Sequence, residues 1–196
     1  MDESVETPVR TKRRRLTPEA RRAEIIATAT KLISTRGYNG LAFQDVADTG
    51  GMTLAGILHY FSSKEDLLIS VLEARDEEDR QHSRQVMACF GNNPIRGIDA
   101  FVERNAAQPE IIRLYAVVGG EALDPRHPAH SYFQYRYDRA LRNMSSLLDG
   151  VVADPDSTAR QLIATQDGLQ LQWFYSNYGF DLLEQWKILS GRFLPR

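Results

Sequence analysis

Residues 37–67, GYNGLAFQDVADTGGMTLAGILHYFSSKEDL, decide the fold of this chain. The glycines at 50 and 51 predict a tight turn between two short helices, one over about 43–49 and one from Thr53 to about 61. Thr53 is typical of a helix cap, because its side-chain oxygen can accept a hydrogen bond from a backbone N–H of the first turn. Two short helices around a glycine turn predict a helix-turn-helix, although the same pattern also occurs as a packing motif in compact helical proteins.

The sequence on both sides of this stretch predicts helices as well. One helix begins after Thr17, at a proline that suits the first turn, and ends at Gly37. A longer helix follows from Lys64 to Gly91, and its charged stretch 73–84 is expected to be a solvated surface. The sustained alternation of apolar and polar residues that marks a strand is missing, so the predicted fold class is all-α. Further helices are expected over 94–107, 110–123, 129–150, 155–178 and 181–193.

The charges are unevenly distributed although their total is nearly balanced. The 196 residues include 26 acidic and 24 basic side chains, which excludes a wholly basic DNA-coating protein and an acidic disordered chain. Between Arg10 and Arg22, seven basic residues stand against one acidic residue, Glu19. Such a cationic end indicates contact with a polyanion, and the alternative is a solvated tail without a partner.

Cysteine usage and hydropathy predict a cytoplasmic protein. Cys89 is the single cysteine, so no intramolecular disulfide can form. The first residues lack the apolar segment of a secretory signal, and no run of about 18 apolar residues predicts a membrane span. We therefore expect a protein of a reducing compartment, with no membrane anchor.

The residues around the predicted helix-turn-helix resemble a known family. Gly37-Tyr38, 43–47 (FQDVA), 51–53 (GMT) and 59–67 (HYFSSKEDL) are similar, in order and spacing, to the N-terminal signature of the TetR family of bacterial transcriptional regulators. The resemblance implies a homodimer that binds operator DNA through its N-terminal domain and a small effector through its C-terminal domain. The implied parts are a basic flexible arm at 1–16, a three-helix DNA-binding domain at 17–63, and a helical effector-binding and dimerisation domain at 64–196.

Residues at the start of the second helix of the pair are candidates for DNA contact, because this helix enters the major groove of DNA. Thr53 can offer its hydroxyl to a phosphate, whereas Leu54, Ala55 and Gly56 are poor in hydrogen-bonding groups. Apolar contact of Leu54 or Ala55 with thymine methyl groups is one available mode of reading. The remaining sequence recognition is expected to come from close backbone approach at Gly56 and from the shape of the DNA.

The resemblance implies further DNA contacts. His59, Tyr60 and Lys64 stand where family members commonly place them, with Lys64 in the position of a lysine that contacts the DNA backbone. For His59 and Tyr60 the alternative is packing under the recognition helix. Leu58 stands where an aromatic residue, usually tyrosine, is common in the family.

The basic arm can also be interpreted as a DNA-binding segment, because it directly precedes the predicted DNA-binding domain. Arg13, Arg14 and Arg15 immediately precede the first helix, where a flexible arm can follow DNA into a minor groove. Each phosphate that the arm neutralises is expected to steepen the salt dependence of binding.

Aromatic residues gather in the C-terminal part of the chain, where 11 of the 18 lie from Tyr132 onward. They fit a mostly apolar pocket between helices, a dimer face, or plain core packing. The candidate ligand-binding residues are Phe90, Phe101, Tyr115, Tyr132, Phe133 and Trp173.

The resemblance places the dimer interface in the last two helices, near 155–178 and 181–193. Gly168 permits close approach of two helices there. The residues expected to supply the buried area between subunits are Leu162, Leu169, Trp173, Leu183 and Trp186.

The sequence contains no recognisable pattern of an enzyme or a metal centre. Asp124, His127 and His130 come nearest to a metal-binding cluster, but their spacing across a loop with two prolines favours capping and loop solvation. No Ser/His/Asp arrangement and no glycine-rich phosphate loop occurs in recognisable order. We therefore expect no catalytic activity, no metal and no cofactor.

The sequence thus predicts a ligand-responsive, DNA-binding transcription regulator: a homodimeric repressor that a small-molecule effector releases from double-stranded operator DNA. The alternative is an all-helical small-molecule-binding or catalytic protein whose helix-turn-helix is only a packing motif. The basic arm, Thr53 at a helix start and Lys64 just beyond the helix pair favour the regulator, because packing requires none of them.

Overall fold

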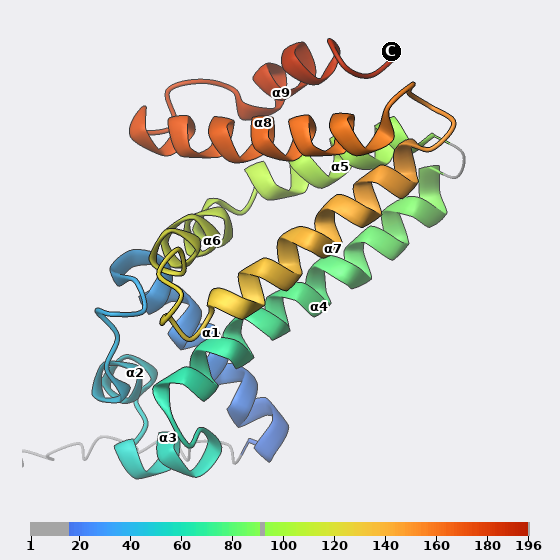
Figure 1. Cartoon of the computed structure of the whole chain (residues 1–196). Helices are drawn as coiled ribbons and strands as arrows, with labels where there is room; N and C mark the ends of the chain where they lie inside the picture. The colour runs from blue at the N-terminus through green and yellow to red at the C-terminus, as the bar shows by residue number, and fades with distance from the viewer. Residues whose placement is uncertain (1–15, 91–92, 196) are drawn as a thin grey trace, which may run out of the picture.

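The computed structural model describes residues 16–90 and 93–195, and these residues form nine α-helices and no strand (Figure 1). The predicted all-α fold class is confirmed. The helices are α1 (Pro18–Arg36), α2 (Phe43–Gly50), α3 (Leu54–Tyr60), α4 (Lys64–Phe90), α5 (Pro94–Ala106), α6 (Pro109–Glu121), α7 (His130–Leu148), α8 (Pro155–Tyr175) and α9 (Leu182–Ser190).

The ends of the helices follow from the residues that stand there. At the start of α1, Thr17 accepts a hydrogen bond at 3.2 Å from the N–H of Ala20. The chain leaves α1 at Gly37, whose φ of +73° is a conformation that favours glycine. Prolines occupy the first turns of α1, α5, α6 and α8, where a missing N–H removes no helical bond. Helices α8 and α9 end somewhat before the predicted limits, because the residues that follow them form turns.

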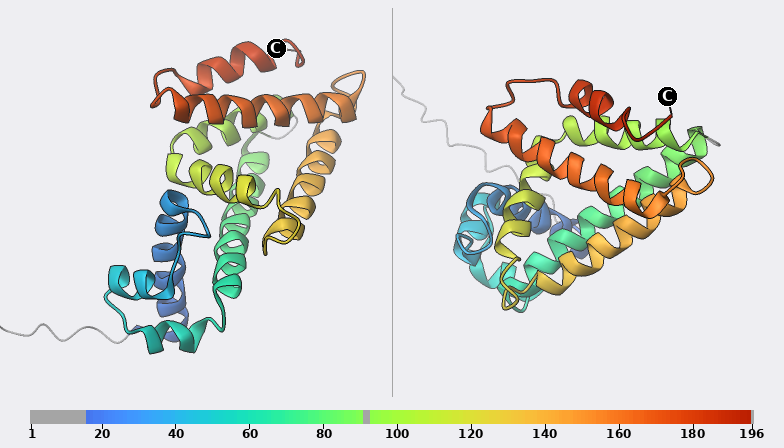
Figure 2. Two further views of the ribbon diagram at one scale, coloured as in Figure 1. Left: turned by 60° about the vertical axis from the view of Figure 1, so that its left-hand side comes forward. Right: turned by 45° about the horizontal axis from the view of Figure 1, so that its top comes forward.

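Two clusters of buried apolar side chains hold the helices together. The first joins α1, α2, α3 and the start of α4 to α6 and the start of α7, with Ile57 and Val118 among its fully buried members. The second joins α5, α8 and α9 and includes Leu162 and Trp186. As Figures 1 and 2 show, α2 and α3 lie at one end of the molecule and α8 and α9 form a layer across the other, with the long helix α4 reaching between them. We call α1–α3 the head and α5–α9 the body.

The first apolar core crosses the predicted boundary between the two domains at residues 63 and 64. Helix α1 packs along α6, and Leu114, Val118 and Ala122 of α6 lie in the same core as Ile25 and Ala29 of α1. Apolar burial of this kind is the main favourable term in packing helices together. The head is therefore attached to the body through α6 as well as through α4.

The charged stretch 73–84 is not simply a solvated surface, and that prediction is wrong for its middle. Arg75 and Asp76 are 5% and 4% exposed. Asp76 accepts a hydrogen bond at 2.7 Å from Arg139 and also pairs with Arg136, both on α7. Burial opposes the ionisation of Asp76, but the two guanidinium groups outweigh it, so its pKa lies below the ordinary value.

A helical spacing in the sequence could have revealed this buried stretch. Leu68 and Leu72 are fully buried on α4, and Arg75 and Asp76 continue the same face of the helix one turn further on. A buried charge is stable only when it is paired: Arg75 pairs with Asp79 on its own helix, and Asp76 pairs with arginines of α7, far away in the sequence.

Among the described helices, none is both long and apolar enough to cross a membrane.

Candidate nucleic-acid interface

The turn between α2 and α3 has the geometry of a helix-turn-helix. Gly51 adopts a left-handed backbone with φ 59° and ψ 39°, and its N–H bonds back to the last turn of α2. Helix α3 follows, with Thr53 as its cap: the hydroxyl oxygen accepts a hydrogen bond at 3.1 Å from the N–H of Gly56. Ile57 is fully buried in the core, so the opposite side of α3 faces solvent. The predicted pair of short helices is therefore present.

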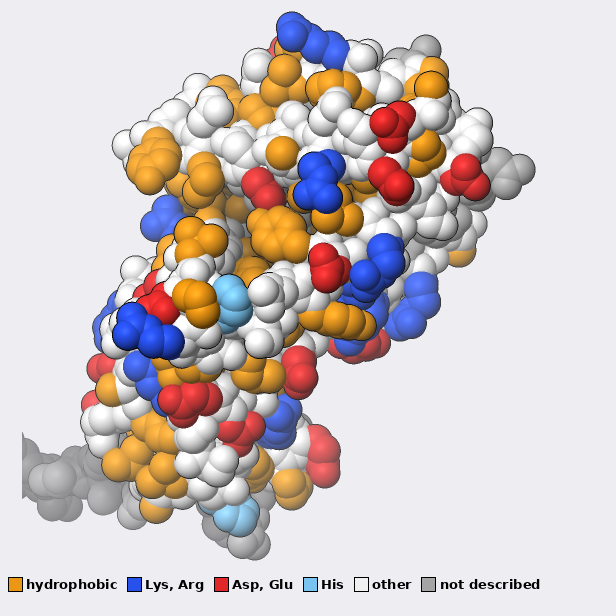
Figure 3. Space-filling model, in the orientation of Figure 1, with side chains coloured by type: hydrophobic (Ala, Val, Ile, Leu, Met, Phe, Trp, Pro, Cys, Tyr) orange, Lys and Arg blue, Asp and Glu red, His pale blue; other side chains and the backbone are white. Residues whose placement is uncertain are grey.

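The outward side of α3 is mainly apolar. Leu54 is 39% exposed and Leu58 is 49% exposed. Ala55 and His59 are exposed as well. Figure 3 shows hydrophobic side chains reaching the surface at the end of the molecule that α2 and α3 form. A helix presenting this side to DNA has few side-chain groups for hydrogen bonds to base edges.

A surface hollow of about 320 Å³ lies beside the start of α3. Arg21, on α1, and Thr53 both line it, and a guanidinium and a hydroxyl are groups that suit a phosphate oxygen. Arg21 also pairs with Glu24 on the next turn of α1. The residues that line the hollow are Arg21, Gly51, Met52, Thr53, Gly56 and Tyr60.

Sequence reasoning missed Arg21 as a member of this site. The residue stands a whole helix away from Thr53 in the sequence, and only the packing of α1 against α2 and α4 brings the two together. Its membership of the basic run between Arg10 and Arg22 is the signal that could have indicated it.

Lys64 lies at the start of α4, with its ammonium 4.3 Å from the centre of the Tyr38 ring. Tyr38 is buried, and its hydroxyl donates a hydrogen bond at 3.0 Å to Glu65 Oε1. Burial and this carboxylate raise the pKa of Tyr38 to about 12, so the phenol remains protonated as the donor. The cation–π contact limits where the lysine can point, which favours a defined contact over a freely moving one.

The other predicted DNA-contacting residues divide into two groups. His59 is exposed, and its ring meets that of Tyr60 edge to face at 5.2 Å. Tyr60 is half-buried and packs against the first apolar core, so packing is part of its role. Arg13, Arg14 and Arg15 lie outside the described residues.

Glu121, at the end of α6, binds the loop that follows α1. Its carboxylate accepts hydrogen bonds from the backbone N–H groups of Tyr38, at 2.8 Å, and Asn39, at 3.3 Å, and from the Asn39 side-chain amide at 3.2 Å. A side chain at Gly37 would meet this carboxylate, since a Cβ there would lie 2.5 Å from Glu121 Oε1. The imidazole of His127 packs edge to face on the Tyr38 ring at 5.0 Å. The body thus holds the same tyrosine that contacts Lys64.

Three of the predicted ligand-binding residues come together in the body. Phe133 meets the rings of Tyr115 and Tyr132 at 6.3 and 5.4 Å. The Tyr115 hydroxyl donates at 3.2 Å to Asp76, and the guanidinium of Arg136 lies 3.9 Å from the centre of the Tyr115 ring. This cluster combines aromatic surface with buried polar groups, as binding sites for small molecules do.

The remaining three predicted ligand-binding residues lie elsewhere. Trp173 belongs to the second apolar core, where its ring contacts those of Phe174 and Tyr178. Phe90 is exposed at the end of α4, and Phe101 is half-buried on α5. The structure therefore does not bring the six residues into one site.

The residues expected to form the dimer interface point into the chain itself. Leu162, Leu169, Trp173 and Trp186 are buried in the second core, and Leu183 packs against it. These side chains are already covered within their own chain, and their part in a dimer interface stays a prediction. The exposed side of α8 instead carries Ala164, Leu171 and Tyr175, with Gly168 between them.

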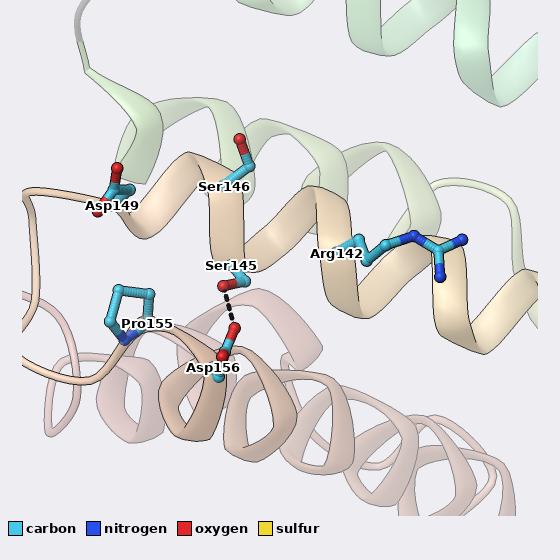
Figure 4. Close-up of a pocket in the computed structure, with 6 residues that line it drawn as sticks. All are labelled: Arg142, Ser145, Ser146, Asp149, Pro155 and Asp156. Carbon is cyan, nitrogen blue, oxygen red and sulfur yellow. Dashed lines mark hydrogen bonds between the residues drawn. The ribbon is translucent and has the colours of Figure 1, made fainter.

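A second hollow lies between the end of α7 and the start of α8 (Figure 4). Five of its six lining residues are of polar or charged types, and the Ser145 hydroxyl donates a hydrogen bond to Asp156 across it. None of the candidate aromatic residues lines this hollow. The lining residues are Arg142, Ser145, Ser146, Asp149, Pro155 and Asp156.

The loop residues considered as metal ligands have other partners. Asp124 accepts hydrogen bonds from Arg126, including one at 2.8 Å. His127 Nδ1 accepts a hydrogen bond from the N–H of Ala129 at 3.2 Å, and His130 Nδ1 lies 2.8 Å from the carbonyl oxygen of Ala122. The three side chains stabilise the loop between α6 and α7, in agreement with the capping interpretation.

These features define a class: an all-helical protein with an N-terminal helix-turn-helix and a larger helical body. Comparison with known proteins agrees with this class. Residues 25–71 match the family described as "Bacterial regulatory proteins, tetR family". Over this segment the chain is similar to the TetR family.

Three relatives illustrate the similarity. The HTH-type transcriptional regulator PksA of Bacillus subtilis is 26% identical over 161 residues, which are 78% of each chain. The HTH-type transcriptional repressor KstR2 of Mycolicibacterium smegmatis is 33% identical over 55 residues, 28% of this chain and 27% of the other. The crystal structure of a transcriptional regulator from Saccharomonospora viridis in complex with choline has a TM-score of 0.78 at 23% identity, over 92% of this chain and 100% of the other.

Proposed function

We propose that this chain is a homodimeric transcriptional repressor that binds operator DNA through α3 and leaves it when a small molecule binds the body. The observation that carries the proposal is the exposed side of α3, which has the Arg21–Thr53 hollow at its start and Lys64 just beyond its end. A solvent-facing helix between groups suited to phosphates is the arrangement by which a helix-turn-helix enters the major groove.

In the proposed complex, the polar groups around α3 position it on the DNA backbone. Thr53 already accepts a hydrogen bond from Gly56, and its O–H is left to donate to a phosphate oxygen. Arg21 adds a charge-assisted contact beside it, and Lys64 binds a phosphate beyond the other end of α3. The arginines at 13, 14 and 15 extend these contacts into a neighbouring minor groove.

The effector is proposed to bind the body at the cluster of Tyr115, Tyr132 and Phe133. One structural relative was solved in complex with choline, which supports a small-molecule site in a body of this shape. By linkage, an effector that lowers the affinity for DNA must itself be bound less tightly when DNA is present. The contact of Glu121 with Tyr38 provides a direct connection from the body to the head.

The dimer is proposed to form through the outward side of α8, together with α9. Ala164, Gly168, Leu171 and Tyr175 follow one another at spacings of three and four residues, so they lie on one face of the helix. A Cβ built at Gly168 meets no atom within 4 Å, which leaves room for the helix of a second subunit. Ile188 of α9 is exposed as well. A two-fold axis at the layer of α8 and α9 would place the heads of both subunits on the same side of the dimer. Each head could then bind one half-site of the operator DNA.

DNA binding is tested with the region upstream of the gene, using fluorescence anisotropy at several salt concentrations. Lys64→Ala is expected to weaken binding and to flatten the log–log salt dependence by roughly 0.9, the contribution of one phosphate contact. Arg21→Ala is expected to act similarly. Arg96→Ala on α5 is the matched control, because it removes an exposed basic side chain outside both the proposed DNA-binding surface and the proposed dimer surface. Wild-type protein without salt-sensitive DNA binding would refute the proposal.

A further inference from the structure

We infer that the protein recognises its DNA sequence mainly through thymine methyl groups, which Leu54 and Leu58 contact in the major groove. The inference rests on the proposed function, because it names the chemistry of the DNA that the same helix reads.

The first argument is the side-chain composition of the outward face of α3. Leu54 and Leu58 are one helical turn apart, so their side chains lie on the same face. At 39% and 49% exposure they are the two large apolar side chains of this helix left open to solvent, since Ile57 is fully buried. Between them stand the small residues Ala55 and Gly56, which allow the helix backbone close to a DNA surface.

The second argument is which bases such a face can distinguish. Guanine and adenine are usually read by bidentate hydrogen bonds from Arg, Lys, Asn or Gln, and none of these residue types occurs within Leu54–Tyr60. Thymine is the base that presents an apolar group, its C5 methyl, in the major groove. Contact between a leucine and this methyl removes apolar surface of both from water, which is favourable.

The third argument concerns what occupies this face. The Arg21–Thr53 hollow and Lys64 flank it, and these cationic and hydroxyl groups suit a polyanion better than an apolar protein surface. A stable protein–protein interface buries roughly 800 Å² on each partner, far more than two leucines and an alanine offer. The occupant that fits both the apolar stripe and its charged flanks is the DNA major groove.

The test changes the DNA rather than the protein. Binding sites are selected from a random DNA pool with the full chain, and each thymine of the selected site is then replaced in turn by deoxyuridine. This replacement removes the C5 methyl and keeps every hydrogen-bonding group of the base. We expect at least one thymine in each half-site at which the affinity falls about fourfold, the factor for losing one buried methylene-sized group.

Variants of the protein show which leucine contacts the thymine methyl group. In Leu58→Ala or Leu54→Ala, the penalty for deoxyuridine at the contacted thymine is expected to disappear, which a double-mutant cycle measures. Both side chains are exposed, so the variants are expected to fold normally, and thermal unfolding verifies this. Leu123→Ala is the control: this leucine is 80% exposed on the turn after α6, and the deoxyuridine penalty is expected to persist unchanged.

Three outcomes overturn the inference in different ways. If DNA is selected but no deoxyuridine changes its affinity, methyl reading is refuted while the DNA-binding function stands. If no DNA is selected, the proposed function fails together with the inference. If Leu58→Ala binds the selected DNA as the wild type does but loses self-association in sedimentation, the stripe is a protein contact.

Discussion

Glu121, the last residue of α6, accepts a hydrogen bond at 2.8 Å from the backbone N–H of Tyr38, two residues beyond the end of α1. The same tyrosine lies under the ammonium of Lys64 and donates its hydroxyl hydrogen to Glu65. Tyr38 thus joins the end of α6, through its backbone, to the start of α4, through its side chain. Any shift of α6 relative to α1 must move Tyr38, and with it the surroundings of the proposed phosphate contact.

Replacing Glu121 is expected to loosen this connection. Glu121→Ala removes the acceptor of the Tyr38 and Asn39 N–H groups, and leaving the N–H of buried Tyr38 without a partner costs about 1–3 kcal/mol of unfolding free energy. The affinity for DNA is expected to fall as well, because Tyr38 and Lys64 lose their fixed positions. Urea unfolding and anisotropy measure the two effects.

Two further variants decide whether the carboxylate itself matters. Glu121→Gln retains one acceptor oxygen and is expected to lie between wild type and Glu121→Ala. Glu73→Ala removes an exposed glutamate from α4 and is expected to change neither quantity. Equal stability of the Glu121→Ala and Glu73→Ala proteins would show that the contact contributes nothing.

Asp76 is expected to be among the most sensitive polar positions of the chain. Asp76→Asn leaves the guanidinium groups of Arg136 and Arg139 without their carboxylate, and removing one partner of a buried ion pair costs about 3–5 kcal/mol. Its pKa is lowered in the folded state, so the stabilisation by the carboxylate is present above the ordinary pKa of 3.8 and fades as the pH falls below it. Urea unfolding from pH 7 downward should therefore show the difference between variant and wild type shrinking in acid. If Asp76→Asn lost no more unfolding free energy than Asp138→Asn, which changes an exposed residue, this account would be contradicted.

Asp167 of α8 is expected to behave in the opposite way. Burial raises its pKa, against the hydrogen bond at 2.8 Å that the Tyr137 hydroxyl donates to it. A carboxyl whose pKa is raised in the folded state favours folding when protonated and loses this advantage as the pH rises through the folded pKa. Asp167→Asn keeps an acceptor for Tyr137 without the charge, so its urea midpoint at pH 7 is expected to exceed that of the wild type. The gain should vanish in acid, and a lower midpoint at pH 7 would show that the charge stabilises the fold.

The sequence was sufficient for the helices because their signals are local. Thr53 caps the helix that it was predicted to cap, Thr17 and Ser63 cap α1 and α4 in the same way, and Gly37 and Gly51 adopt the positive φ that ends a helix. Such signals act within one turn of the chain and need no knowledge of the fold. The candidate DNA-binding residues from Thr53 to Lys64 lie within one segment of twelve residues, so a local pattern also indicated where to look.

The partners that come from distant parts of the chain were not predictable in this way. Arg75 and Asp76 look like surface residues until α7 supplies the charges that pair with Asp76. Arg21 joins the hollow beside α3 only through the packing of α1. Large apolar residues such as Leu162 suit a chain's own core and a subunit interface equally well, and only the fold determines which one they form.

The inward and outward sides of α8 therefore allow the proposed dimer to be tested apart from the stability of the subunit. Gly168→Lys places a long cation where the chain itself has open space, so the subunit is expected to remain folded while the dimer dissociates. Leu162→Ala removes a fully buried side chain from the second core and is expected to cost about 2–5 kcal/mol of unfolding free energy. Sedimentation velocity gives the oligomeric state, and circular dichroism during thermal unfolding gives the stability. A Gly168→Lys protein that remains dimeric would rule out close pairing of α8 at this glycine, and with it the arrangement of the two heads that such pairing implies.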